Sequence, residues 1–238
     1  AGGTEEPIDP VRCVTNRSSG KMGFAVAEAG RDLGYEVTVI AAATSVTPPA
    51  GVEIVQVRTA LEMGSALEHL HREFDLLVMA AAVADYRPRR MHAVKLSSGE
   101  GTLKLDLVPN PDLLASLRGE REGKITVGFA LEWGGTPKER VARARQKLKG
   151  KGCDVIALND PSAAETAFGS DHNRLTLLFA DGRQVELGLL DKYEAARSLL
   201  TQVESLRSSP AARDARPAPT VRKASVPRAG RSKTRKTR

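Results

Sequence analysis

Three short segments of this sequence combine polar and small residues in patterns suited to binding a nucleotide. The first is residues 16–23 (NRSSGKMG), a polar loop with glycine that leads into a predicted helix. Free backbone N–H groups and the helix dipole favour an anion there, and Lys21 adds positive charge. The loop matches neither a Walker A motif nor the Gly-x-Gly-x-x-Gly fingerprint. An ordinary loop before a helix is therefore the alternative interpretation.

The second segment, residues 80–88 (AAAVADYRP), ends a buried apolar strand. Small side chains at residues 80–82 allow a ligand to approach the backbone closely. Asp85 follows at the strand tip, where its carboxylate can accept a hydrogen bond from a ribose hydroxyl or an exocyclic amine. A turn aspartate before Pro88 is the alternative.

The third feature is a pair of lysines, Lys147 and Lys151, on the last turn of a predicted helix. Side chains four residues apart share a helix face, so the two ammonium groups can hold phosphates together. The helix dipole alone also favours lysine at this end. We find no Ser/His/Asp or Cys/His set in the sequence. Phosphoryl or nucleotidyl transfer, which relies on positioning and charge neutralisation, suits these residues better.

The elements that must position these segments follow an α/β pattern. Nearly continuous apolar runs predict buried strands at 36–42, 52–57, 75–82, 124–131 and 154–158. Helical periodicity or capping residues predict helices at 22–33, 59–74, 136–150 and 189–206, and a short one after residues 110–112. Residues 175–179 and 184–187, joined by Asp181-Gly182, predict a β-hairpin, and residues 1–20 read as loop. We therefore expect an α/β fold, with a mostly parallel sheet flanked by helices and a late hairpin. Ligands of such sheets bind beyond the carboxyl ends of the strands.

The net charge of +7 comes from the end of the chain. Residues 208–238 hold ten Lys or Arg and one acid (+9), which leaves 26 basic and 28 acidic side chains (−2) in residues 1–207. We therefore expect a globular domain over residues 1–207 and a disordered basic tail over 208–238. No apolar run approaches the ~20 residues of a membrane span. We expect a protein that does not bind membranes.

The two cysteines, Cys13 and Cys153, have no paired spacing, which fits a reducing cytoplasm. The histidines are scattered, so the sequence assigns no metal ligands. The chain opens with Ala1-Gly2-Gly3 and no initiator Met. We expect that the first strand of the sheet lies upstream of this sequence, in a longer polypeptide.

Taken together, the motifs closely resemble those of bacterial phosphopantothenate–cysteine ligase over roughly residues 1–205. The segments that carry the resemblance occur in one order: 1–12, 16–23, 80–88, 110–112 (NPD), 127–130 (VGFA), 159–160 and 168–173 (FGSDHN). In many bacteria this ligase is the C-terminal half of a protein that also holds a flavin-dependent phosphopantothenoylcysteine decarboxylase. The resemblance implies a Rossmann-like fold and a homodimer that uses CTP and Mg²⁺. It also implies ligation of 4'-phosphopantothenate to cysteine through an acyl-cytidylate.

Residue roles follow from the resemblance, position by position. Asn16 matches the asparagine that contacts the acyl-cytidylate and supports its conversion to product. Lys147 and Lys151 match the phosphate-binding lysines. The residues that match nucleotide contacts are Ala81, Asp85, Asn110, Pro111, Asp112 and Phe129.

One segment departs from the family pattern. The family usually has Lys-x-Lys-Lys after the Asp-Tyr-Arg-Pro stretch, with a catalytic first lysine, whereas this chain has Lys95-Leu96-Ser97-Ser98. We assign the catalytic role to Lys95. Two alternatives stay open at this point: an NAD(P)-binding Rossmann oxidoreductase, and a non-catalytic nucleotide-binding relative of the ligase.

Overall fold

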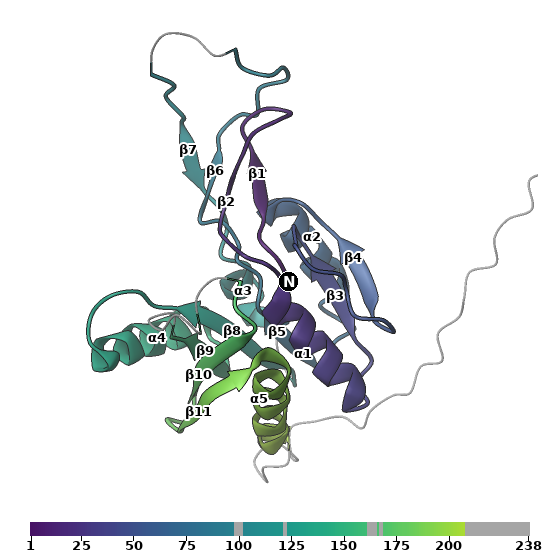
Figure 1. The fold of residues 1–238 in the computed structure, drawn as a ribbon, viewed down its shortest axis with the longest axis vertical. Coiled ribbons are helices and arrows are strands. Elements are labelled where there is room, and N and C mark those ends of the chain that lie inside the picture. The colour runs from purple at the N-terminus through teal and green to yellow at the C-terminus, as the bar shows by residue number, and fades with distance from the viewer. Residues whose placement is uncertain (98–101, 121–122, 161–165, 167–168, 208–238) are drawn as a thin grey trace, which may run out of the picture.

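The computed structural model describes residues 1–97, 102–120, 123–160, 166 and 169–207. A central sheet flanked by helices forms the body of the molecule, and an arm of short strands projects from it (Figure 1). The predicted basic tail lies outside the described residues. The elements in chain order are β1 (Glu5–Pro7), β2 (Cys13–Thr15), α1 (Lys21–Asp32), β3 (Thr38–Ala41), β4 (Glu53–Gln56), α2 (Ala60–Leu70), β5 (Leu76–Met79), β6 (Tyr86–Pro88), β7 (Leu107–Pro109), α3 (Leu113–Ser116), the 3₁₀ turn η1 (Arg118–Glu120), β8 (Ile125–Leu131), α4 (Pro137–Lys151), β9 (Val155–Asn159), β10 (His172–Phe179), β11 (Gln184–Asp191) and α5 (Lys192–Arg207).

The central sheet has the strand order β11-β10-β9-β8-β5. β5, β8 and β9 run parallel, whereas β10 pairs antiparallel with both β9 and β11. Along β8 and β9, Val127 and Val155 enter the core on one face, and Ala130 and Ile156 enter the core on the other. Burial on both faces explains the nearly continuous apolar sequence of these strands. The expected α/β class is confirmed, and the hairpin supplies the antiparallel strands.

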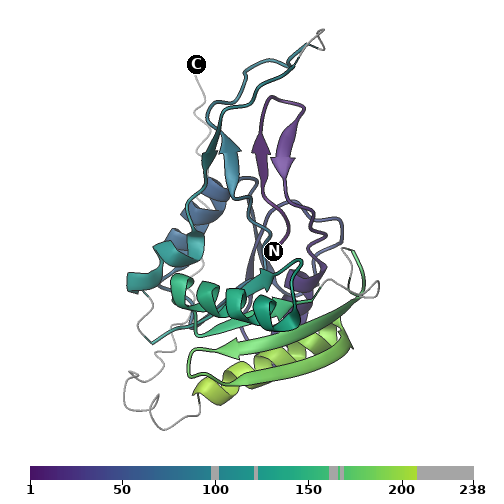
Figure 2. The same cartoon turned by 90° about the vertical axis from the view of Figure 1, so that its left-hand side faces the viewer.

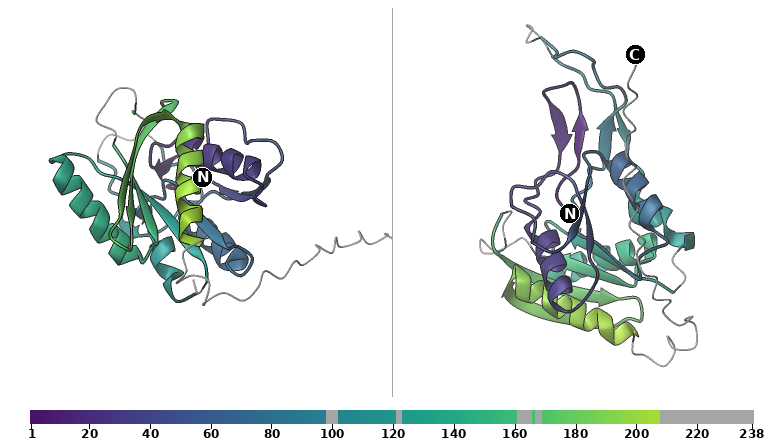
Figure 3. Two further views of the ribbon diagram at one scale, coloured as in Figure 1. Left: turned by 90° about the horizontal axis from the view of Figure 1, so that it is seen from below. Right: turned by 90° about the vertical axis from the view of Figure 1, so that its right-hand side faces the viewer.

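Helices cover both faces of this sheet (Figure 3). α1 and α5 pack side by side on one face, where small residues such as Ala29 and Ala196 allow close contact. α4 covers the other face through Ala144 and Leu148. The predicted starts of α2 and α4 are confirmed, because each has a complete capping box at its first turn.

The first three residues lie between two sheets. The parallel pair β3–β4 forms a separate sheet, and Gly3 bridges Ala43 after β3 and Ala82 after β5. The backbone nitrogen of Ala1 donates to the carbonyl of Ile40 at 2.7 Å. These contacts bring the chain that follows β3 and β5 together at one edge of the body.

The arm was not predicted, and its first part corrects the interpretation of residues 1–20 as loop. β1 and β2 form an antiparallel hairpin, and β6 and β7 form a second antiparallel pair beside it (Figure 2). The buried side chains at the root of the first hairpin are polar, Thr4 (0% exposed) and Glu6 (1% exposed). Glu6 Oε1 accepts from Ala60 N at 2.9 Å, and Thr4 Oγ1 accepts from Ala84 N at 2.9 Å. No apolar alternation therefore marks these strands in the sequence.

Two predicted boundaries at the end of the domain were wrong. The hairpin strands are longer than expected, at His172–Phe179 and Gln184–Asp191. Because β11 continues to Asp191, α5 begins at Lys192 rather than at Leu189. The Asp181-Gly182 turn between the strands is confirmed: Gly182 has φ +96°, and the Asp181 carboxylate accepts from Arg183 N at 2.9 Å.

Candidate nucleotide-binding cleft

A cleft of about 830 Å³ lies beyond the carboxyl ends of β5, β8 and β9. Because parallel strands end at the same edge of a sheet, segments distant in sequence meet there. Nine of the ten residues predicted from the sequence line it: Asn16, Ala81, Asp85, Asn110, Pro111, Asp112, Phe129, Lys147 and Lys151. Lys95 does not.

The loop before α1 forms one wall of the cleft. Asn16 Nδ2 donates to Val83 O at 3.0 Å, which fastens this loop to the segment that follows β5. Gly20 is the N-cap of α1, with φ +80° and no capping side chain. A side chain at Gly23 would place its Cβ 2.6 Å from Ala1 Cβ, so glycine is needed for this close approach. The uncapped N-terminus of α1 is suited to an anion in the cleft.

Residues 110–112 cross the floor of the cleft and are held on both sides. Asn110 Nδ2 donates to Ala84 O at 2.8 Å, and Arg87 donates to Asn110 Oδ1 at 3.0 Å. Asp112 Oδ1 caps α3 by accepting from Leu114 N and Ala115 N, both at 3.1 Å. Its other oxygen, Oδ2, pairs with Lys151 Nζ at 2.6 Å. Asp112 therefore links the floor of the cleft to α4.

The environment of Asp112 favours its ionised form. Partial burial opposes ionisation, but the hydrogen bonds from Lys151 and from the α3 backbone outweigh it. The pKa of Asp112 is consequently lowered from its ordinary value.

Lys147 also forms an ion pair with a carboxylate. Its Nζ lies 2.7 Å from Glu132 Oε1, and Arg143 Nε lies 2.7 Å from Glu132 Oε2. Glu132 is buried, which opposes ionisation, yet the hydrogen bonds from Arg143 and Lys147 lower its pKa. Sequence reasoning missed Glu132. The available signal was an acidic residue placed directly after the apolar strand β8.

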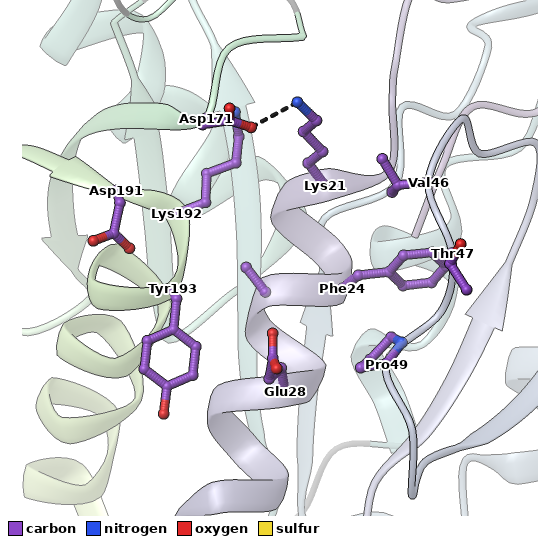
Figure 4. Close-up of a pocket in the computed structure, with 11 residues that line it drawn as sticks. Lys21, Phe24, Glu28, Val46, Thr47, Pro49, Asp171, Asp191, Lys192 and Tyr193 are labelled. Atoms are coloured by element: carbon purple, nitrogen blue, oxygen red, sulfur yellow. Dashed lines mark hydrogen bonds and ion pairs between the residues drawn. The ribbon is translucent and has the colours of Figure 1, made fainter.

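Two further lysines lie at another corner of the cleft, at the first residues of α1 and α5 (Figure 4). Lys21 Nζ pairs with Asp171 Oδ1 at 2.6 Å and donates to Gly169 O at 2.8 Å. Lys192 donates to the carbonyls of Ser170 and His172. Its burial, followed by the charge of Lys21, lowers the pKa of Lys192.

This corner has a second, shallower pocket beside it, of about 480 Å³, also lined by Lys21, Asp171 and Lys192. Sequence reasoning missed Lys192. A lysine at the first position of a helix opposes the helix dipole, and this unfavourable placement is the signal that would have marked it.

Lys95 lies in the arm, in the segment between β6 and β7. The neighbouring Leu96 donates its N–H to Asp9 Oδ2 at 3.1 Å, and its carbonyl accepts from Arg12. Asp9 and Arg12 belong to the turn between β1 and β2. The segment is thus tied to the hairpin turn, away from the cleft lining. The last residue of the variant motif, Ser98, lies outside the described residues.

Among the residues that the structure describes, no group of three or more His, Cys, Asp or Glu side chains is placed to hold a metal ion. Mg²⁺ commonly keeps several waters and is held by one or two carboxylates together with substrate phosphates. The cleft offers the carboxylates of Asp85 and Asp112. These two carboxylates fit a Mg²⁺ ion that is bound together with the phosphates of a nucleotide. No helix in the described part of the chain is long and apolar enough to span a membrane.

Comparisons with known proteins show which family and which solved structure the chain is similar to. Residues 1–206 match the family model described as DNA/pantothenate metabolism flavoprotein C-terminal domain. The bifunctional coenzyme A biosynthesis protein CoaBC of Bacillus subtilis (strain 168) is 36% identical over 207 residues, which are 87% of this chain and 50% of that protein. CoaBC of Mycolicibacterium smegmatis is 43% identical over 195 residues, 79% of this chain and 47% of that protein.

A solved structure is similar as well. The crystal structure of the C-terminal domain of CoaBC has a TM-score of 0.73 and 36% identity, and the match covers 87% of this chain and 93% of that one. By contrast, the chain spans only about half the length of the curated relatives it matches.

Proposed function

Since this chain belongs to the family of the DNA/pantothenate metabolism flavoprotein C-terminal domain, as its motifs indicated, we propose that it joins 4'-phosphopantothenate to cysteine in coenzyme A biosynthesis, with CTP as the activating nucleotide. The observation that carries this proposal is the cleft, where nine motif residues from five separate segments meet. The dinucleotide-binding alternative gains no support from the relatives.

The reaction needs two displacements. A free carboxylate is a poor electrophile, so an oxygen of the phosphopantothenate carboxylate first attacks the α-phosphorus of CTP, and pyrophosphate leaves. The amine nitrogen of cysteine then attacks the acyl carbon. The bond to the CMP oxygen breaks, CMP leaves, and the amine loses a proton to solvent. Both displacements develop negative charge, which preorganised donors in the cleft can stabilise.

We assign Asn16 to the second displacement. An amide NH₂ carries two donors, and one of them bonds to Val83 O. The second N–H of Asn16 is the donor that we assign to the acyl oxygen.

The remaining cleft residues are assigned to the nucleotide. The small residues 80–82 leave backbone groups for the base, and Asp85 accepts from the nucleoside. Lys147 and Lys151 bind the triphosphate. Mg²⁺, bound with the phosphates and with oxygens of Asp85 or Asp112, would supply charge neutralisation. Lys95 retains its proposed catalytic role, which requires its segment to leave the arm and approach the cleft.

The arm supports a proposal of a homodimer. It exposes a set of apolar side chains: Val11, Tyr86, Met91, Val94, Leu103, Leu105 and Leu107. Val94 is 73% exposed and Val11 is 66% exposed. Apolar residues gathered on a projecting arm are typical of a surface that a second protein covers. We assign this partner as a second copy of the chain. Because the curated relatives are bifunctional, we further propose that the ligase is fused to or works beside the decarboxylase, in the cytoplasm.

The decisive experiment supplies CTP, 4'-phosphopantothenate, cysteine and Mg²⁺ and follows pyrophosphate release together with formation of 4'-phosphopantothenoylcysteine. We expect both products in equal amounts, and much lower efficiency with ATP. Binding of CTP without pyrophosphate release would instead support the non-catalytic relative.

A further inference from the structure

Glu132 is a buried acid whose charge is matched by two basic residues of one helix. It follows β8, and its side chain is only 8% exposed. Arg143 and Lys147 are four residues apart on α4 and contact its two carboxylate oxygens separately, each at 2.7 Å. A buried carboxylate requires such partners, because leaving it unpaired would carry a large desolvation penalty.

The two basic partners differ in what else they contact. Arg143 also donates to the carbonyls of Trp133 at 3.3 Å and Gly134 at 3.0 Å, so it fastens the loop after β8 to α4. Lys147, whose side chain is 46% exposed, lines the cleft. The carboxylate of Glu132 therefore connects a structural contact on one side to a cleft residue on the other.

We infer that Glu132 is a positioning residue: it holds the ammonium group of Lys147 at the cleft wall, ready for a phosphate. An unrestrained lysine loses much side-chain entropy when it binds a ligand. A carboxylate that already restrains the side chain reduces this loss, which is preorganisation. The inference rests on the proposed function only in naming a nucleoside triphosphate as the ligand.

A simple counter-charge would have the opposite effect. If Glu132 only neutralised Lys147, its removal would make the cleft more positive, and an anion would bind more tightly. Positioning predicts weaker binding instead. The direction of the change in affinity thus separates the two roles.

The test is a calorimetric titration of the 238-residue chain with CTP in the presence of Mg²⁺. Glu132→Asp keeps the charge but shortens the side chain, so it cannot reach both Arg143 and Lys147. Positioning predicts an increase of about two- to fivefold in the Kd of this variant, as expected for a partly exposed charge pair. Glu132→Gln should weaken binding in the same direction. Lys149→Gln, on the same helix and outside the cleft lining, is the matched control and should leave the Kd unchanged.

A second comparison shows whether Glu132 acts through Lys147. In a Lys147→Gln background, Glu132→Asp should cause no further loss, because the group that it positions is gone. An unchanged or lower Kd in Glu132→Asp, or an equal loss in both backgrounds, would overturn the inference. If the parent does not bind CTP, the proposed function fails, and inorganic triphosphate replaces CTP as the probe. Parent binding of triphosphate, with the same order of variants, would keep the inference, and no binding of triphosphate would end it.

Discussion

Asp112 makes two separable contributions to stability, and two substitutions distinguish them. Its Oδ1 caps α3, and its Oδ2 pairs with Lys151. Asp112→Asn keeps a good N-cap residue but removes the charge, whereas Asp112→Ala removes both. We therefore expect the alanine variant to be the less stable of the two.

The structure sets the size of each effect. Loss of an N-cap costs about 1 kcal/mol. The side chains of Asp112 and Lys151 are 43% and 29% exposed, so solvent screening limits the ion pair to about 0.5 kcal/mol. For a domain of this size, about 1 kcal/mol corresponds to roughly 2–4 °C in Tm. Asp112→Asn should lower Tm by about 1–2 °C, and Asp112→Ala by about 3–6 °C.

Differential scanning calorimetry at neutral pH measures both shifts. Asp106→Asn is the control, since it breaks the exposed pair with Arg89 and is not a helix N-cap; its Tm should match the parent. Equal shifts in Asp112→Asn and Asp112→Ala would show that the cap contributes nothing, and the reasoning from geometry would be wrong.

The charge contribution of Asp112 should also depend on pH. Its pKa in the folded state is lowered from the ordinary value of 3.8. The stabilisation is therefore fully present above that value and is lost as the pH falls through the folded pKa. The Tm difference between the parent and Asp112→Asn should shrink on acidification below pH 3.8. A difference that grew in acid would contradict the assignment.

Four other predictions test the proposed function and its boundaries. Asn16→Ala should release pyrophosphate but stall before product, and normal steady-state turnover in this variant would exclude the assigned role. Lys95→Gln should lower kcat by about 10²–10³-fold if the segment approaches the cleft during the reaction. An unchanged kcat would show that Lys95 has no catalytic role. Truncation after Arg207 should leave ligation unchanged, because a tail of this composition cannot build a core, and a large loss of activity would refute that boundary. Val94→Glu should convert a dimer to monomers in analytical ultracentrifugation. An unaltered dimer mass would show that the dimer interface does not include this part of the arm.

The body of the fold was predictable because its signals are local and repeated. β8 and β9 are apolar on both faces, and Thr59 and Thr136 mark the starts of α2 and α4 with partners three residues on. Parallel strands then required the segments after β5 and β8 to meet. The arm was missed because Thr4 and Glu6, which are buried at its root, are polar and bond to partners 80 and 54 residues away.

The cleft was predictable in part for a related reason. Eight of the nine predicted residues lie in segments that directly follow strands or close a helix, Phe129 lies near the end of β8, and the family resemblance connected them. Glu132 contacts α4, and Lys192 contacts Ser170 and His172 at the start of β10; spacing along the chain does not encode either contact. The sequence did not indicate that Lys95 lies in the arm. The hydrogen bond from Leu96 N to Asp9 Oδ2, which holds this segment against the hairpin turn, is visible only in the structure.

The buried bonds at the root of the arm have a mechanical consequence. A hinge there would separate Glu6 from Ala60 N and Thr4 from Ala84 N, and each buried group left unpaired would cost about 1–3 kcal/mol. We therefore expect the root to resist bending, so that the arm and the body move together. Ala84 directly precedes Asp85 in the cleft. Bending at the root would strain the residue that precedes Asp85, and the amide protons of Ala60 and Ala84 should be among the slowest to exchange with solvent.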